Sequence, residues 1–202
     1  MHGSTPDAPH PSGFDRDAKV VVEQVDDTTW QVKQSFTYSG ARESFTIPAG
    51  MITDFASIPR VFAWYLPRYG RYTRAAILHD HLWEMAHAGQ IDYVDADGTF
   101  RQAMLALGVP FLHRWAMWAA VRWAALAKPN GGKGWWREAW RVLLITILAL
   151  PFLLPPTLVI ALALSMLFVV ESLVYVQLKV GQLVKGRERA KPVNRPRIRW
   201  KL

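Results

Sequence analysis

One run of the chain carries no charge: VLLITILALPFLLPPTLVIALALSMLFVV, from Val142 to Val170. A helix needs about 20 apolar residues to cross the hydrocarbon core of a bilayer, so the run is long enough for one crossing and more. Pro151, Pro155 and Pro156 lie near its middle, where proline disfavours an undisturbed helix. We therefore predict a transmembrane helical hairpin over residues 142–178 with the proline pair at its tip. The alternative is one full span preceded by a shorter helix that dips into the membrane.

Basic residues flank the uncharged run on both sides. Lys128, Lys133, Arg137 and Arg141 precede it, and the tail 179–202 holds nine Lys/Arg against one acidic residue, so the net charge of +8 belongs to the tail. Positive flanks stay on the cytoplasmic side, which predicts an integral protein of the inner membrane with its soluble domain and tail in the cytoplasm. Anionic lipid headgroups are the expected partner of the tail, and nucleic acid is the less favoured one.

Tryptophan is concentrated just before the uncharged run, because six of the ten tryptophans fall between Trp115 and Trp140. Tryptophan favours the boundary between membrane and water, where its apolar ring and its N–H group are both accommodated. Residues 128–141 are therefore expected to form a basic interfacial linker. The predicted membrane-interface residues are Trp135, Trp136, Trp140, Arg137 and Arg141, with Lys179 at the far end of the apolar segment. The alternative is that the rings fill the core of the preceding domain.

The half of the chain before this linker mixes charged and apolar residues as a globular domain does. Strands are expected at Lys19–Val25, Thr29–Tyr38 and Glu43–Ile47, and helices at Ile58–Leu66, Tyr72–His87, Ala96–Leu107 and Pro110–Ala127. We predict an α+β domain over residues 18–127, a small antiparallel β-meander packed by several helices. Residues 1–17 are expected to be a disordered leader. The absence of cysteine excludes disulfides and thiolate metal sites.

A cluster of polar residues lies within this domain. His79 and Asp80 sit inside an otherwise apolar helical stretch, and Thr53, Asp54 and Ser57 follow the third predicted strand. A catalytic site of His79, Asp80 and Asp54 is one interpretation, with His79 and Asp80 binding a divalent metal, since histidine nitrogen and carboxylate oxygen suit zinc. The favoured interpretation is structural: Thr53, Ser57 and Asp97 belong to a polar network, and a buried His79–Asp54 pair locks the helix onto the sheet.

The same residues carry a family resemblance. The segments are Pro48-Ala49-Gly50, Thr53-Asp54-Phe55-Ala56-Ser57-Ile58-Pro59-Arg60, Ala75-Ala76 before His79-Asp80, and Ala96-Asp97 with Phe100, Met104 and Gly108-Val109. In this order they resemble the domain-of-unknown-function family 1353, over about residues 30–121. The resemblance implies a phage or prophage origin and makes Asp54, Ser57, His79, Asp80 and Asp97 the positions to test. It implies no activity, and it does not cover the hairpin or the tail.

Three functions follow from these observations as expectations. The leading one is a phage-encoded, membrane-anchored protein that is not an enzyme and acts at the host inner membrane through lipid contacts or through phage or host protein partners. The first alternative is a membrane-tethered, metal-dependent hydrolase that uses the His/Asp site. The second alternative is a virion or tail component whose hairpin enters the membrane at infection. Metal content that depends on His79 and Asp80 would favour the hydrolase.

Overall fold

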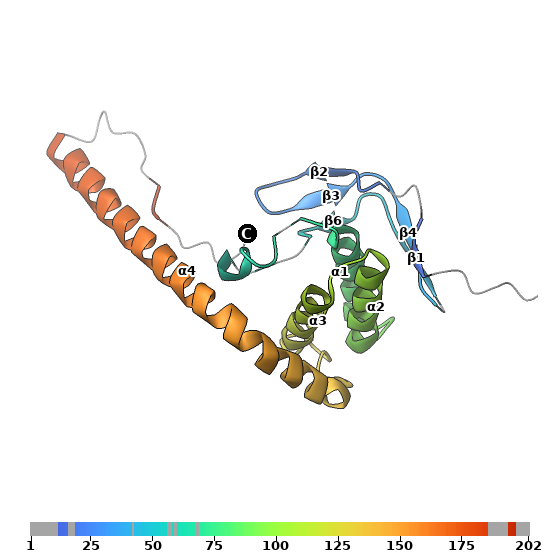
Figure 1. The fold of residues 1–202 in the computed structure, drawn as a ribbon. Coiled ribbons are helices and arrows are strands. Elements are labelled where there is room, and N and C mark those ends of the chain that lie inside the picture. Colours follow the sequence, from blue (N-terminus) through green and yellow to red (C-terminus); the bar gives the residue numbers. More distant parts are fainter. Residues whose placement is uncertain are drawn as a thin grey trace, which may run out of the picture. The chain divides into compact units, whose positions relative to one another are not determined.

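The computed structural model describes residues 12–15, 19–41, 43–55, 58, 60–67, 69–185 and 194–196. Within these ranges it has two small antiparallel sheets and four α-helices, which confirms the α+β class (Figure 1). The chain divides into two compact units, one of residues 1–57 and 66–149 and one of residues 58–65 and 150–202. The first unit holds both sheets, three helices and the beginning of the fourth, so it contains every candidate site residue of the soluble half.

The strands form two three-stranded sheets where the sequence predicts one meander. The first sheet has the order β1-β4-β5, with β1 at Gly13–Phe14, β4 at Phe36–Ser39 and β5 at Ser44–Ile47. The second has the order β2-β3-β6, with β2 at Val22–Gln24, β3 at Trp30–Val32 and β6 at Ile52–Thr53. The expected strand Thr29–Tyr38 is thus divided between the sheets. It is divided because the Val32 amide and carbonyl pair with the backbone of Met51 and Gly50, after which the chain continues into the other sheet.

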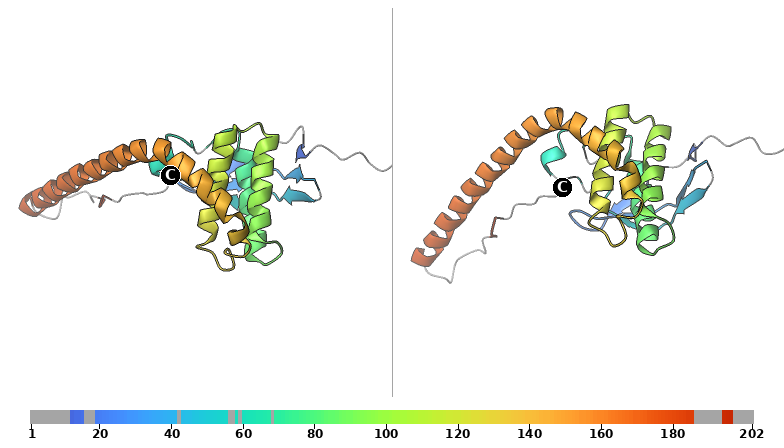
Figure 2. Two further views of the ribbon diagram at one scale, coloured as in Figure 1. Left: turned by 60° about the horizontal axis from the view of Figure 1, so that its bottom comes forward. Right: turned by 90° about the horizontal axis from the view of Figure 1, so that it is seen from below.

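Three helices pack beside the sheets: α1 (Thr73–His87), α2 (Tyr93–Ala106) and α3 (Phe111–Ala125). Helix α1 packs on α2 and α2 on α3, while α1 also contacts β5 and α2 contacts β1; Figure 2 shows the three helices side by side. Gly89 and Gly108 follow α1 and α2 with φ angles of 76° and 69°, the left-handed conformation that commonly ends a helix. Buried side chains of the three helices meet in one cluster of Ala86, Tyr93 and Ala125.

The predicted helix Ile58–Leu66 is much shorter in the structure. It consists of a single 3₁₀ turn, η1, at Arg60–Phe62. The residue before a proline is disfavoured in the helical conformation, and Pro67 therefore opposes a helix that continues through Leu66. This segment belongs to the second compact unit, where the rings of Trp64 and Tyr65 lie 5.7 Å apart.

The uncharged run lies in one continuous helix, α4 (Trp135–Lys185), and the structure does not show the predicted hairpin. Pro151, Pro155 and Pro156 are inside this helix. Each proline removes one backbone hydrogen bond, whereas a hairpin turn would leave several N–H and C=O groups unpaired among apolar side chains. In the part of the chain that the structure describes, one helix is long and apolar enough to cross a membrane, Trp135–Gln182, with a mean hydropathy of 2.4 in its most apolar window.

The beginning of α4 is part of the domain core. Trp135, Ala139 and Val142 are buried and form one cluster with Trp118 and Ala119 of α3. The Trp135 indole donates a hydrogen bond of 3.0 Å to the Arg122 carbonyl at the end of α3. Residues 128–141, expected as a linker, are therefore the α3–α4 connection and the first two turns of α4, and the first compact unit extends to Ala149.

Candidate functional site

The centre of the polar network is Asp97 on α2, whose side chain is fully buried. Its Oδ1 lies 2.8 Å from His79 Nε2 on α1 and accepts a hydrogen bond of 2.9 Å from Trp83 Nε1, one helical turn further along α1. Its Oδ2 accepts a hydrogen bond of 3.0 Å from Arg122 Nη1 on α3. One carboxylate therefore joins three helices, and both of its oxygens are satisfied.

Arg122 brings a full positive charge into this core. Its side chain is completely buried, and its Nε lies 3.4 Å from Glu138 Oε2 on α4, an ion-pair distance without hydrogen-bond geometry. Its Nη2 has no hydrogen-bond partner among the residues that the structure describes. Removing a charged group from water is costly unless an opposite charge is close, and Asp97 and Glu138 supply that charge from two sides.

His79 is held rigidly in this network. Its ring lies 4.5 Å from the Phe100 ring and 5.0 Å from the Trp83 ring, measured between centroids, and 9% of its side chain is exposed. The sequence led us to expect Asp54 as its partner; the structure corrects this, because the contact is made by Asp97. Through His79, helix α1 is thus tied to α2 and, by way of Asp97 and Arg122, to α3.

The neighbouring residue Asp80 points to a different part of the domain. Its Oδ2 accepts a hydrogen bond from the Thr53 hydroxyl at the end of β6, and the same hydroxyl accepts one of 2.9 Å from the Phe55 amide. Burial raises the pKa of the Asp80 carboxyl well above its usual value, and the negative charges of Asp54 and Glu84 raise it further. The Thr53 hydrogen bond opposes this shift. The structure thus brings Thr53 and Asp80 together, a contact that the sequence did not predict.

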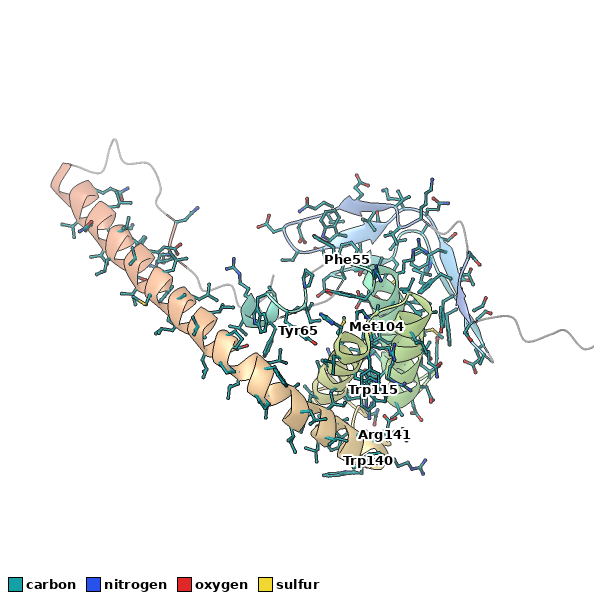
Figure 3. All side chains as sticks on the ribbon, in the orientation of Figure 1. Phe55, Tyr65, Met104, Trp115, Trp140 and Arg141 are labelled. Atoms are coloured by element: carbon teal, nitrogen blue, oxygen red, sulfur yellow. The ribbon has the colours of Figure 1, made fainter. Side chains whose placement is uncertain are left out.

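The turn after β6 is shaped by these contacts. Phe55 has a φ angle of 62°, a left-handed conformation that is uncommon for a large residue. The Thr53 hydroxyl accepts a hydrogen bond from the Phe55 amide, and the Phe55 ring, labelled in Figure 3, packs against Trp30 and Tyr69 with centroid distances of 5.6 and 5.3 Å. These contacts offset the backbone strain. Ser57, the remaining predicted residue of this segment, lies outside the described residues.

His79 and Asp80, the predicted metal ligands, contact different partners in the structure. Within the described residues no group of three or more histidine and acidic side chains is arranged to hold a metal ion. Successive side chains on a helix point about 100° apart, so His79 can face Asp97 while Asp80 faces Thr53. The expected catalytic residues His79 and Asp80 therefore make separate contacts, His79 with Asp97 and Asp80 with Thr53.

The predicted membrane-interface residues differ in how exposed their side chains are. Trp135 is buried, which matches the alternative that a ring fills the core, whereas Trp136 and Trp140 are exposed. Arg137, Arg141 and Lys179 are exposed as well. The Arg141 guanidinium lies 5.1 Å from the centroid of the Trp140 ring, a cation–π geometry that Figure 3 shows at the beginning of α4.

Sequence reasoning missed Trp83, Arg122 and Glu138 as members of the network. A signal for Arg122 was present: it follows Trp118 by four residues, which places a charged side chain on the same face of α3 as that buried tryptophan. An arginine on such a face requires a buried acid, and Asp97 is the fully buried acid nearby.

Residues 30–121 match the family model described as "Protein of unknown function (DUF1353)". This segment belongs to the DUF1353 family. No curated protein and no solved structure matches the chain. The DUF1353 segment contains Asp54, His79, Asp80 and Asp97, but it ends one residue before Arg122 and well before α4. The central carboxylate therefore lies inside the matched segment, while the arginine that neutralises it and the whole of α4 lie outside.

Proposed function

We propose that this chain is a membrane-anchored protein that acts at the inner membrane of a bacterial host, through lipid or protein contacts of its DUF1353 domain and not through catalysis. The phage or prophage origin implied by the family resemblance is part of this proposal. Helix α4 is the anchor, and the domain is the part that meets other molecules.

The observation that carries the proposal is the composition and burial of α4. Within the described residues, no residue of its most apolar window is buried, although the mean hydropathy of the window is 2.4. An apolar surface of this length exposed to water would drive aggregation, whereas in a bilayer it is solvated by lipid. Trp135 and Val142, at the beginning of the same helix, are buried in the domain core.

The closed polar network supports a role without catalysis. Asp97 has both oxygens occupied by buried donors, and His79 is packed between two rings with little access to solvent. A general base must reach a substrate proton within hydrogen-bond distance. A network that joins three helices and leaves so little open surface is better suited to holding the domain together.

A second candidate function, hydrolysis by a membrane-tethered enzyme, has one observation in its favour. Asp80 is only partly buried, and its raised pKa is a property that acid catalysts share. The metal-dependent form of this function lacks a three-ligand group in the described residues. Asp80 would therefore have to act as the general acid itself, with Thr53 as its hydrogen-bonded neighbour.

The proposal is tested by expressing the full chain in a bacterium and separating membranes from the soluble fraction after alkaline carbonate extraction. We expect the chain to remain in the inner-membrane fraction, and its release by carbonate would overturn the proposal. Reporter fusions after Ala127, at Pro156 and after Leu202 then determine the orientation. A continuous α4 that crosses once places the two outer fusions on opposite sides, whereas the hairpin expected from the basic flanks places both in the cytoplasm.

A further inference from the structure

The first four turns of α4 carry large apolar side chains on a face adjacent to the one that packs in the domain core, since successive side chains on a helix point about 100° apart. These side chains are between 44% and 83% exposed, and we call them the outer stripe: Trp136, Trp140, Leu143, Leu144 and Ile147. They recur at helical spacing along one side of the helix. The other side, at Trp135, Ala139 and Val142, is buried against α3. This part of α4 is therefore apolar on both sides, and protein covers one of them.

The exposed apolar surface of α4 begins at a different position along the helix axis on each of the two sides. On the covered side, contacts with the domain continue to Ile145, which packs on the buried cluster, and to Thr146, whose hydroxyl accepts a hydrogen bond of 3.1 Å from Trp123. On the outer side, exposed apolar surface begins at Trp136. The offset is about nine residues, or roughly 14 Å along the helix axis.

This offset is incompatible with a helix that enters a bilayer upright. An upright helix meets the headgroups at one height all around. If that height were at Trp136, the contacts of α3 with Thr146 would lie in hydrocarbon; if it were beyond Thr146, the outer stripe would lie in water. A tilted helix with its outer stripe against the membrane removes both conflicts, because the stripe enters the interface first while α3 stays on the aqueous side.

The charges around the outer stripe are complementary to an anionic surface. Lys128, Lys133, Arg137 and Arg141 are exposed. Glu138 is the single acidic residue between positions 126 and 149, and its carboxylate is directed toward the buried Arg122. A second copy of this chain is a poorer occupant, since it would bring the like charges of two such faces together.

We propose that the outer stripe and these four basic residues form a docking face by which the DUF1353 domain lies against a bilayer rich in anionic lipid. Tryptophan rings enter the interfacial region, and the arginine and lysine side chains extend to the headgroups. The inference rests on the proposed function, because α4 must anchor the chain in a bilayer before the domain can bind the surface of that bilayer.

The chain has no cysteine, so single-cysteine variants of the full protein report on individual positions. Trp136→Cys reports on the outer stripe, and Val169→Cys reports on the uncharged part of α4. Leu105→Cys is the matched control, because Leu105 is an exposed apolar residue of α2 outside the docking face. Each variant is spin-labelled and reconstituted in vesicles of equal parts phosphatidylcholine and phosphatidylglycerol. The accessibility of the label to oxygen, which partitions into lipid, is compared with its accessibility to a water-soluble nickel complex.

We expect labels at positions 136 and 169 to report lipid and the label at position 105 to report water. Replacing Arg137 and Arg141 by glutamine should lower the ratio of docked to undocked domain about fivefold for each arginine removed. Vesicles of phosphatidylcholine alone should weaken docking in the same direction.

Other results overturn the inference in distinguishable ways. If position 169 reports lipid while position 136 reports water as position 105 does, the docking face is wrong and the anchor stands. If position 169 also reports water, the proposed function itself fails. If position 136 is shielded from both reagents, the face is covered by protein, and a partner or a second copy replaces the lipid surface.

Discussion

The carboxylate of Asp97 and the guanidinium of Arg122 lie 3.0 Å apart, and both side chains are completely buried. They come from α2 and α3, and Arg122 connects the pair onward to α4 through Glu138 and through its own carbonyl. A buried ion pair is weak evidence of stability by itself, but removing one member leaves the other charge without compensation. The pair therefore makes the integrity of the domain depend on a single carboxylate.

Asp97→Asn should lower the free energy of unfolding by about 3–5 kcal/mol, because the Arg122 charge would remain buried without its principal partner. The measurement is urea unfolding of the full chain in detergent micelles, followed by tryptophan fluorescence. Asp95→Asn is the matched control, since Asp95 is exposed in the first turn of the same helix. Removing its charge should lower the free energy of unfolding by at most about 1 kcal/mol. Equal effects of the two variants would contradict a central role for Asp97.

Asp80→Asn should make the domain more stable at neutral pH. The folded-state pKa of Asp80 is raised, so folding favours its protonated form. Below the unfolded-state value of about 3.9 the carboxyl is protonated in both states and the stabilising protonated form is fully present. As the pH rises through the folded-state pKa that contribution is lost. The difference between variant and natural chain should therefore be absent at low pH and largest above the folded-state pKa.

The pH dependence is measured as the thermal unfolding midpoint of both proteins across this range. Glu84→Gln serves as a second variant, because the Glu84 charge contributes to the raised pKa. It should weaken the dependence without abolishing it, since burial is the larger cause. A natural chain that gains stability as the pH rises in this window, relative to Asp80→Asn, would show that the sign is wrong.

Removal of divalent metal should leave the thermal unfolding midpoint unchanged. We expect this because no three-ligand group is arranged to hold a metal ion in the described residues, and only an ion bound to the folded state would stabilise it. The measurement compares the midpoint of purified protein with and without EDTA, and after addition of zinc. A midpoint that falls with EDTA and recovers with zinc, and that loses this response in His79→Ala, would revive the metal-dependent hydrolase.

Gly131→Ala should destabilise the connection between α3 and α4. A Cβ atom at this position would lie 1.8 Å from the Ala125 carbonyl oxygen, so the backbone must shift, at a cost of about 1–3 kcal/mol. Gly132→Ala is the matched control, because nothing lies within 4 Å of its added Cβ, and its effect should stay within about 0.5 kcal/mol. Urea unfolding measures the free energy of unfolding of both variants. A Gly131→Ala variant as stable as the natural chain would contradict the close approach of residue 131 to the Ala125 carbonyl.

Trp135→Phe should lower the free energy of unfolding by about 1 kcal/mol, the net contribution of its hydrogen bond to the Arg122 carbonyl. Trp136→Phe should have no comparable effect on the unfolding of the domain, because that ring is exposed. Urea denaturation followed by near-ultraviolet circular dichroism gives the free energy of unfolding of each variant. A larger destabilisation by Trp136→Phe than by Trp135→Phe would mean that Trp136, and not Trp135, is the buried ring.

Local patterns predicted much of this molecule. Apolar residues at helical spacing indicated α1 over nearly its observed length, and the uncharged run indicated a membrane-competent segment. The polar residues Thr53, Asp80 and Asp97 were also identified, because polar groups in apolar surroundings need partners. The predictions of α1 and of the apolar segment succeeded because each depends on residues within a few turns of one another.

Partners distant in the sequence could not be predicted in the same way. His79 pairs with Asp97 and not with Asp54, and Arg122 joins the same carboxylate from a third helix. The continuous α4 likewise contradicts a local rule, since prolines that favour an interruption are accommodated inside a helix. Each outcome depends on which helices pack together, and helical periodicity carries no information on that choice.

The sequence by itself determined that this chain has an α+β half and an apolar half, because the spacing of apolar residues and the distribution of charge can be read along the chain. The tertiary structure decided which tryptophan is buried and which is exposed, and it joined the beginning of α4 to the core of the domain. The physical reason is that burial depends on the packing of side chains from separate helices. Trp135 and Trp136 are adjacent in the sequence, and only the position of α3 makes one of them part of a core.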